Sequence, residues 1–210
     1  MKSIVIVGFG GFGREVDWLS RECGRAVLGF LDDNVPPGKK GNYTILGGLD
    51  AWSDYPDTEF VVAIGNPRVR KKIVEKLASQ GVTDFATLIH PSVKMDESVD
   101  VGKGTMICAG SIATVDIVIG DHVILNLNVT VGHDDRIHDF VTVAPMVALS
   151  GNVILEDGVE VGTGAAIRQG ITMACGSMLG MGGVQTKDSE ANTIYIGSPA
   201  KPFKPLPEFI

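Results

Sequence analysis

An apolar residue recurs at every sixth position for almost a hundred residues, and this period restricts the folds open to the chain more than any other feature. About half of the residues in an average protein are apolar, so an unbroken run of sixteen arises by chance on the order of once in tens of thousands of trials. The sixteen positions are Ile89, Met95, Val101, Ile107, Ala113, Ile119, Leu125, Val131, Ile137, Val143, Leu149, Leu155, Val161, Ile167, Met173 and Leu179.

A period of six fits neither a helix, which repeats every 3.6 residues, nor a flat strand, which alternates every two. It suits a chain that turns a corner every six residues, so that three sides close a triangular coil of about 18 residues with the apolar side chain inside. Such coils stack at the spacing of β-strands, about 4.8 Å. Residues 89–184 therefore predict a parallel β-helix of about five coils.

The first 86 residues show a different pattern, in which short apolar runs alternate with helical stretches. Strands are predicted at 4–7, 26–31 and 60–64, and a polar loop rich in proline and glycine at 36–41. One helix is predicted from about Arg14 to Cys23, and a second begins with Asn66 as N-cap and ends at Gly81. Three strands with crossover helices predict a small, Rossmann-like parallel α/β domain.

We therefore expect an α/β domain at 1–86, a β-helix at 87–186 and a tail at 187–210. The tail contains Pro202, Pro205 and Pro207. Proline lacks the N–H that regular structure uses, so no helix or strand is expected in the tail.

Composition narrows the classes of function. The net charge of the 210-residue chain is −7, with no basic patch, which argues against nucleic acid as the main partner. No apolar run approaches the roughly 18 residues of a membrane span. Cys23, Cys108 and Cys175 match no disulfide or zinc pattern, so a reduced, cytoplasmic chain is expected, with Cys108 and Cys175 as small core residues.

His133 is the first candidate for chemistry. It lies two residues past the inward position Val131, so its side chain is expected near a corner or on the outer face. A neutral imidazole can accept a proton from an attacking amine or hydroxyl, and the adjacent Asp134 could fix its tautomer. One coil further on is Gly151, where a missing side chain would leave room for a ligand. The alternative is a solvated surface histidine.

The other histidines give weaker signals. His133, Asp134 and His138 are the candidates for a metal site, but their spacing matches no established motif, so no metal is predicted. His90, which precedes Pro91, is expected at the junction between the two domains.

A glycine-rich segment, Gly8 to Gly13, follows the first strand and opens the first helix, with Asp32 and Asp33 about 20 residues further on. Backbone N–H groups at the start of a helix can bind a pyrophosphate, and the carboxylates could hold ribose hydroxyls. The short domain resembles one mononucleotide-binding half, so a nucleotide-linked sugar fits better than NAD. The alternative is a tight turn that binds no ligand.

Several short motifs, in this order and spacing, give a resemblance that covers the whole chain. The chain resembles bacterial hexapeptide-repeat sugar acetyltransferases of the sialic-acid O-acetyltransferase family, which includes an N-acetyltransferase of UDP-4-amino sugars. The motifs are Val7-Gly8 through Glu15, Phe30-Leu31-Asp32-Asp33, Ala63-Ile64-Gly65-Asn66, Ile89-His90-Pro91-Ser92, Leu125-Asn126, Gly132-His133-Asp134 and Gly197-Ser198-Pro199-Ala200-Lys201.

The resemblance implies a left-handed β-helix and a homotrimer that binds acetyl-CoA in the groove between two subunits. It also implies His133 as the general base with Asp134 as its partner. The residues it assigns to acetyl-CoA are Asn126, Thr142, Gly151, Thr163 and Met181, and those it assigns to the nucleotide sugar are Gly10, Gly11, Gly13, Asp32, Asp33, Gly65 and Asn66.

Thr142 is a departure from the family pattern, because some relatives have a second histidine there, close to the acetyl carbonyl. Either the threonine hydroxyl or a backbone N–H contacts the thioester, or that contact is dispensable.

The leading hypothesis from the sequence is acetyl transfer from acetyl-CoA to the 4-amino group of a UDP- or dTDP-linked 4-amino-4,6-dideoxy sugar. O-acetylation of a sialic acid or related sugar is the second enzymatic reading. A non-catalytic trimer that binds a sugar nucleotide, and an NAD-dependent enzyme, are the alternatives of other classes.

Overall fold

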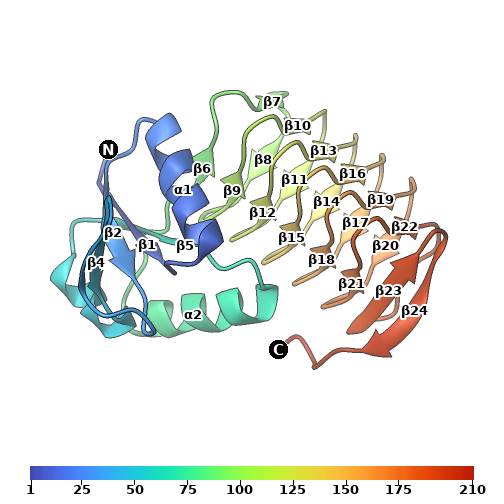
Figure 1. The fold of residues 1–210 in the computed structure, drawn as a ribbon. Helices are drawn as coiled ribbons and strands as arrows, with labels where there is room; N and C mark the ends of the chain where they lie inside the picture. The colour runs from blue at the N-terminus through green and yellow to red at the C-terminus, as the bar shows by residue number, and fades with distance from the viewer.

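The computed structural model describes all 210 residues and divides them between a small α/β domain and a long β-helix (Figure 1). The α/β domain has one five-stranded sheet in the order β3-β4-β2-β1-β5. Strands β1 (Ile4–Val7), β2 (Val27–Leu31), β4 (Tyr43–Gly47) and β5 (Glu59–Val62) are parallel, and β3 (Gly38–Lys40) is antiparallel to β4. The predicted parallel sheet is confirmed, with two strands more than expected.

The predicted loop at 36–41 is wrong, because β3 and β4 form a hairpin across it. Gly41, with φ of +61°, lies in the turn, in the left-handed region that glycine adopts without strain. Ile45 on β4 is buried and pairs with Phe30 on β2. This strand is stabilised by a partner more than ten residues away, so its local sequence is a weak signal.

Helices cover the two faces of this sheet. On one face, Val16 and Leu19 of α1 (Gly11–Glu22) share a core with Ile4, Ile6 and Phe30. On the other face, α2 (Pro67–Ser79) buries Val74 and Leu77 against the sheet, together with the short 3-10 helix η1 (Leu49–Asp54). Asn66 is the N-cap of α2 as predicted, and its side chain accepts a hydrogen bond from the N–H of Val69.

The β-helix is built from two-residue strands in three parallel sheets, called here the first, second and third face. Each strand pairs with the strand 18 residues further on, which confirms the predicted coil length. The first face has β6 (Leu88–Ile89), β9 (Met106–Ile107), β12 (Ile124–Leu125), β15 (Thr142–Val143), β18 (Glu160–Val161) and β21 (Met178–Leu179).

The second face has β7 (Lys94–Met95), β10 (Ile112–Ala113), β13 (Thr130–Val131), β16 (Ala148–Leu149), β19 (Ala166–Ile167) and β22 (Val184–Gln185). The third has β8 (Asp100–Val101), β11 (Val118–Ile119), β14 (Arg136–Ile137), β17 (Ile154–Leu155) and β20 (Thr172–Met173). The chain turns between faces through a residue with positive φ at every sixth position, as at Asp116, His122 and Asn128. A corner every six residues is therefore confirmed.

The interior of the β-helix is apolar along its length. The predicted inward positions from Ile107 to Leu179 are all buried. The three before them are less covered, and Met95 is 40% exposed. The first coil has no coil beneath it, so its side chains lack neighbours on one side.

The prediction of an irregular tail is wrong. Residues 193–205 form an antiparallel hairpin of β23 (Thr193–Gly197) and β24 (Ala200–Pro205), and β23 extends the first face by pairing with β21. Pro202 and Pro205 are tolerated because β24 is an edge strand, where one row of N–H groups has no strand to bond to.

The α/β domain packs directly on the first coils of the β-helix. Met106, Cys108 and Ile124 from the first face share one buried core with α1 and the sheet. In Figure 1, α1 lies beside β6 and β9, and α2 runs below the first face. The carboxyl ends of β1, β2 and β5 are thereby held at a defined place relative to the coils.

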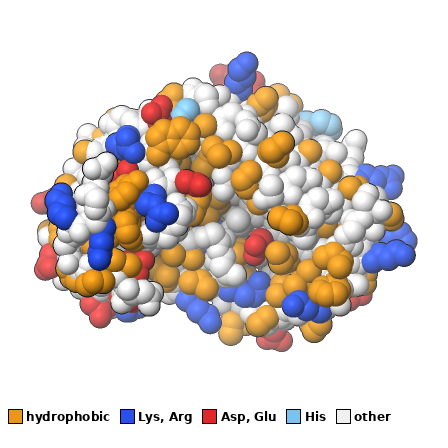
Figure 2. Space-filling view, viewed as in Figure 1, with side chains coloured by type: hydrophobic (Ala, Val, Ile, Leu, Met, Phe, Trp, Pro, Cys, Tyr) orange, Lys and Arg blue, Asp and Glu red, His pale blue; other side chains and the backbone are white.

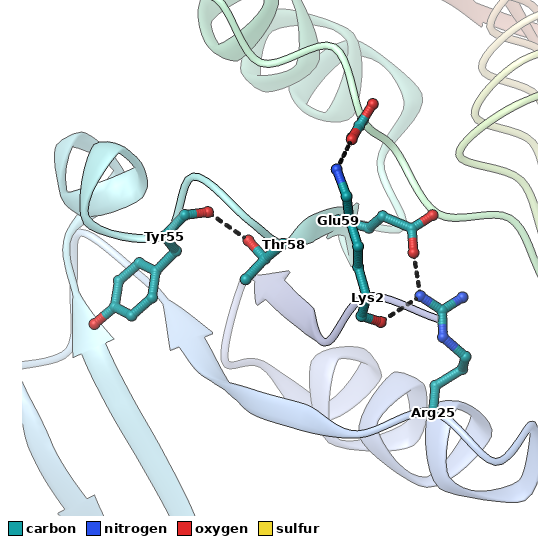
Figure 3. A network of polar contacts seen from close by, with 6 residues as sticks. Lys2, Arg25, Tyr55, Thr58 and Glu59 are labelled. Atoms are coloured by element: carbon teal, nitrogen blue, oxygen red, sulfur yellow. Dashed lines mark hydrogen bonds and ion pairs between the residues drawn. The ribbon is translucent and has the colours of Figure 1, made fainter.

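The opposite, amino edge of the sheet is tied together by polar contacts (Figure 3). Arg25 donates to the carbonyl of Lys2 at 2.8 Å and forms an ion pair with Glu59, while Lys2 pairs with Asp84. The hydroxyl of Thr58 donates to the carbonyl of Tyr55 at 2.7 Å. These contacts join the starts of β1, β2 and β5, so this edge has a structural role.

Hydrophobic side chains also lie at the surface of both domains (Figure 2). On the β-helix they include Ile112, Val115, Met146 and Met181, of which Met181 is 78% exposed. The chain has no helix with the length and apolar character needed to span a membrane.

Candidate active site

His133 and Asp134 form a hydrogen-bonded pair at the corner between the second and third faces. The imidazole Nδ1 lies 2.7 Å from Oδ2 of Asp134, and both side chains are more than half exposed. Because a carboxylate only accepts hydrogen bonds, Nδ1 carries the proton and Nε2 keeps its free lone pair. The pair thus lies at an exposed corner, where the sequence predicted His133, and its role as a base stays a prediction.

Gly151 lies directly beside this imidazole, one coil further on. A Cβ built on Gly151 would lie 2.4 Å from Nε2 and 2.5 Å from Cε1 of His133. The prediction that Gly151 lies beside the imidazole of His133 is therefore confirmed. The imidazole itself fills the space left by the missing side chain, and the backbone N–H of Asn152 donates to the carbonyl of His133 at 2.7 Å.

Asp135, which sequence reasoning missed, lies beneath this pair. Its side chain is fully buried at a position where Ile117 and Val153 occupy the neighbouring coils. Its Oδ1 accepts the N–H of Val153 at 2.7 Å, and its Oδ2 has no hydrogen-bond partner. Burial raises the pKa of Asp135 to about 7. The sequence signal for it is one acidic residue at a coil position that is apolar in the coils before and after it.

Three other residues assigned to acetyl-CoA, Asn126, Thr163 and Met181, lie on the corner between the first and second faces. Thr163 and Met181 are exposed. Asn126 is half-buried, bonds to the N–H of Leu127, and lines a cavity of about 140 Å³ with Trp18 and Glu15 of α1. Within one chain, the structure does not bring these residues together with His133 and Gly151, because the second face separates the two corners.

Thr142 begins strand β15 on the first face, away from His133, and is buried. Its hydroxyl donates to the carbonyl of Gly65 at 2.7 Å, and its backbone N–H donates to the carbonyl of Val159 at 2.9 Å. Both donors of Thr142 are therefore used within the chain. A contact from this residue to the acetyl group stays a prediction.

The residues assigned to the nucleotide sugar meet at the carboxyl edge of the parallel sheet. Asp32 accepts the backbone N–H of Phe9 at 2.8 Å through one oxygen and that of Asn34 at 2.8 Å through the other. Asp33 accepts the N–H of Leu49 at 2.6 Å. Asp32 therefore holds the glycine-rich turn in place.

The start of α1 is open to an anion. Its N-cap Gly10 offers no side chain to the free N–H groups, and the first turn has no acidic residue. No atom outside the adjoining residues lies within 4 Å of a Cβ built on Gly10 or Gly11. At Gly13 a Cβ would lie 2.0 Å from the carbonyl oxygen of Gly8, so this glycine allows the helix to approach the strand.

A cavity of about 180 Å³ opens beside this turn. It is lined by residues that follow three different strands, among them Gly8, Asp32, Asp33 and Ile64. Gly65 and Asn66 come directly after Ile64 and are exposed, but neither lines the cavity. The arrangement is suited to a ligand that joins an anionic group to a polar ring with hydroxyl groups.

The remaining histidines are not arranged as metal ligands. His122 is buried, stacks on Phe140 with ring centroids 5.2 Å apart, and burial lowers its pKa to about 4. His138 is exposed and lies 3.9 Å from Asp157. His90 is at the domain junction as expected, with its ring 6.0 Å from that of Trp18. No group of three or more His, Cys, Asp or Glu side chains is placed to hold a metal ion.

The three thiols are poor nucleophiles. Burial raises the pKa of Cys23, Cys108 and Cys175, to about 12 for Cys108. A neutral thiol attacks a thioester weakly, so the structure offers no activated cysteine for a covalent acetyl intermediate. Cys108 is a buried core residue as predicted, whereas Cys175 is only partly buried.

Comparison with known proteins places these features in context. Residues 3–77 match the family described as the PglD N-terminal domain. The chain is 31% identical to GDP-perosamine N-acetyltransferase of Escherichia coli O157:H7 over 79% of this chain and 78% of the relative. It is 35% identical to UDP-N-acetylbacillosamine N-acetyltransferase of Bacillus subtilis over 52% of each chain.

A solved structure covers nearly the whole molecule. It is a mutant of perosamine N-acetyltransferase from Caulobacter crescentus in complex with CoA and GDP-perosamine. Its TM-score is 0.91 at 30% identity, covering 97% of this chain and 98% of that one. The predicted fold class, a small parallel-sheet domain followed by a left-handed parallel β-helix, is confirmed.

Proposed function

The chain belongs to the hexapeptide-repeat amino-sugar N-acetyltransferases, and from this premise we propose that it moves an acetyl group from acetyl-CoA to the 4-amino group of a nucleotide-linked sugar. The observation that carries the proposal is the exposed His133–Asp134 pair with Nε2 free as a base. It lies in a chain whose α/β domain has an open helix start and a cavity at the carboxyl edge of its sheet.

The chemical step needs one base and no covalent intermediate. The neutral amine attacks the thioester carbonyl carbon, and Nε2 of His133 accepts the proton that the nitrogen loses. The C–S bond then breaks, the amide forms, and CoA leaves as a thiolate that takes up a proton. Asp134 accepts the Nδ1–H bond, so the neutral tautomer has its lone pair on Nε2, and the carboxylate stabilises the imidazolium that forms when Nε2 takes the proton.

The nucleotide sugar would bind at the edge formed by Gly10, Gly11, Gly13, Asp32, Asp33, Gly65 and Asn66. The free N–H groups at the start of α1 suit the pyrophosphate, and the cavity beside Asp32 and Asp33 suits the nucleoside. The named relatives act on GDP- and UDP-linked sugars, so guanosine joins uridine and thymidine as a candidate base.

We further propose that the working enzyme is a homotrimer. In one chain, His133 and Gly151 lie on a different corner from Asn126, Thr163 and Met181. A second copy packed alongside would bring one chain's His133 corner next to the other's Asn126 corner and form a groove for acetyl-CoA. Exposed apolar side chains such as Ile112 and Met146 are consistent with such packing. A cytoplasmic location stays a prediction.

The test is acetyl-CoA consumption, followed by release of free thiol, with a panel of UDP-, dTDP- and GDP-linked 4-amino sugars. His133→Ala is compared with wild type and with His138→Ala, which removes an equally exposed histidine at a different corner, between the third and first faces. We expect turnover with one amino sugar, loss by about 10² or more in His133→Ala, and little change in His138→Ala.

Other outcomes would indicate a different function or mechanism. Thiol release only with a sialic acid would assign O-acetylation. Nucleotide binding without binding of acetyl-CoA would indicate a non-catalytic sensor, and a rise in melting temperature with NADH in place of acetyl-CoA would indicate a dehydrogenase. Full activity in His133→Ala would contradict the mechanism.

A further inference from the structure

The hydroxyl of Thr142 joins the β-helix to the turn that follows strand β5. It donates to the carbonyl oxygen of Gly65 at 2.7 Å across 77 residues of sequence, and the side chain is almost completely buried. A buried hydroxyl keeps a single proton for donation, so this bond has a fixed direction. The contact therefore holds one backbone carbonyl of the α/β domain at a defined point on the first face.

Arg70, on α2, also hydrogen-bonds to this turn. Its fully buried guanidinium donates to the carbonyls of Ile64 at 2.6 Å and Gly65 at 3.0 Å. It also donates to the backbone carbonyls of His122, Phe140 and Val141, at 2.9, 2.6 and 3.2 Å. These three residues lie on two successive coils of the β-helix. Gly65 thus accepts one hydrogen bond from α2 and one from the β-helix.

The turn at Ile64 and Gly65, which is bonded by Thr142 and Arg70, lies next to the cavity at the carboxyl edge of the sheet. Ile64 lines that cavity, and its Cδ1 lies 2.7 Å from where a Cβ on Gly8 would be. Asn66, the next residue, caps α2 through its side chain. Any movement of the Gly65 carbonyl would shift the rim of the cavity relative to the coils of the β-helix.

We propose that Thr142 is a positioning residue that, together with Arg70, sets the bound nucleotide sugar in register with the coils of the β-helix. The inference rests on the proposed function, in which the acceptor binds to the α/β domain and the acetyl donor to the β-helix. Thr142 stands where some relatives have a second histidine. In this proposal it acts through Gly65 and makes no contact with the thioester.

The physical reason is that group transfer tolerates little misplacement of the two reacting groups. An amine attacks a thioester efficiently only when its nitrogen is held about 3–3.5 Å from the carbonyl carbon with the orbitals aligned, and a shift of about 1 Å can cost on the order of a hundredfold in rate. The two substrates here sit on different domains. A rigid polar connection between these domains, buried from water, keeps that distance constant.

Thr142→Val tests the inference, because valine keeps the shape and removes the donor. We expect kcat/KM for the amino sugar to fall on the order of tenfold, with the KM for acetyl-CoA unchanged. Thr142→Ser keeps the hydroxyl and should restore activity close to wild type. Thr172→Val, the same change at the start of β20 on the third face, is the matched control and should leave kinetics unchanged.

Three results would contradict the proposed positioning role of Thr142. Wild-type kinetics in Thr142→Val would show that the bond is not needed, and a raised KM for acetyl-CoA would show that the residue acts on the donor. Equal losses in Thr142→Ser and Thr142→Val would also contradict it, since only one lacks the hydroxyl. A purely structural role would lower the melting temperature without separating the two substrates.

Hydrogen exchange separates this inference from the proposed function. If wild type turns over no amino sugar, the proposed function fails, but the connection can still be tested in the intact protein. Peptides covering 60–72 should exchange faster in Thr142→Val than in wild type or Thr142→Ser. Unchanged exchange would overturn the positioning inference by itself.

Discussion

The imidazole of His133 occupies the space that a side chain on Gly151 would fill, since a Cβ there would lie 2.4 Å from Nε2. The two residues are 18 positions apart, so they stack at the same corner of successive coils. The glycine is thus required for the histidine to adopt its observed position.

Gly151→Ala should displace the imidazole without unfolding the protein. The added methyl group forces the ring away from its place beside Asp134, and we expect kcat to fall by about 10². Steady-state kinetics measure the effect. In the His133→Ala background the same substitution should cause no further loss, and an additive loss would contradict this account.

Asp135 should make the protein less stable as the pH rises. Burial raises its pKa from an ordinary value of 3.8 to about 7, so the folded state holds a proton between about pH 4 and pH 7 that the unfolded state has released. The stability that this proton provides is fully present below pH 4 and is lost as the pH passes 7.

Asp135→Val, which matches the valine of the next coil, should remove this pH dependence. Urea unfolding at pH 5 and pH 8 should show a smaller difference than in wild type, with the variant the more stable protein at pH 8. Asp116→Asn, at an exposed corner, is the control and should keep the wild-type dependence. A wild-type slope in Asp135→Val would contradict the assignment.

Arg70 should be essential for stability. Its guanidinium donates to five backbone carbonyls from both domains, and burial lowers its pKa to about 9. Arg70→Met leaves these acceptors unsatisfied, and we expect a loss of about 3 kcal/mol or more. Chemical denaturation measures it, and Arg21→Met on the exposed side of α1 should stay within about 0.5 kcal/mol of wild type.

Phe209 should stabilise the contact between α2 and the coils. Its ring lies 6.5 Å from that of Phe140 and 5.7 Å from the guanidinium carbon of Arg68, and it fills the space beside Gly158. Because Phe209 is only partly buried, Phe209→Ala should cost about 1–2 kcal/mol. Phe203→Ala, on the exposed hairpin strand, should cost much less, and similar losses in a thermal unfolding comparison would argue against a specific role for Phe209.

The local sequence determined the β-helix and the place of His133 at one of its corners. Every coil repeats the same short pattern, and each strand pairs with the strand 18 residues away, so the period alone predicts which residues stack. The neighbourhood of His133 and Gly151 follows from that count. The glycine-rich turn and the N-cap Asn66 could also be predicted, because turn and cap chemistry depends on a few adjacent residues.

Only the tertiary structure decided the features that depend on contacts between distant segments. The β3–β4 and β23–β24 hairpins are stabilised by strands that the local pattern does not mark. The burial of Asp135 depends on the coils above and below it. The bonds from Thr142 and Arg70 to Gly65 exist because the two domains dock in one orientation, and no period or motif within either segment encodes that docking.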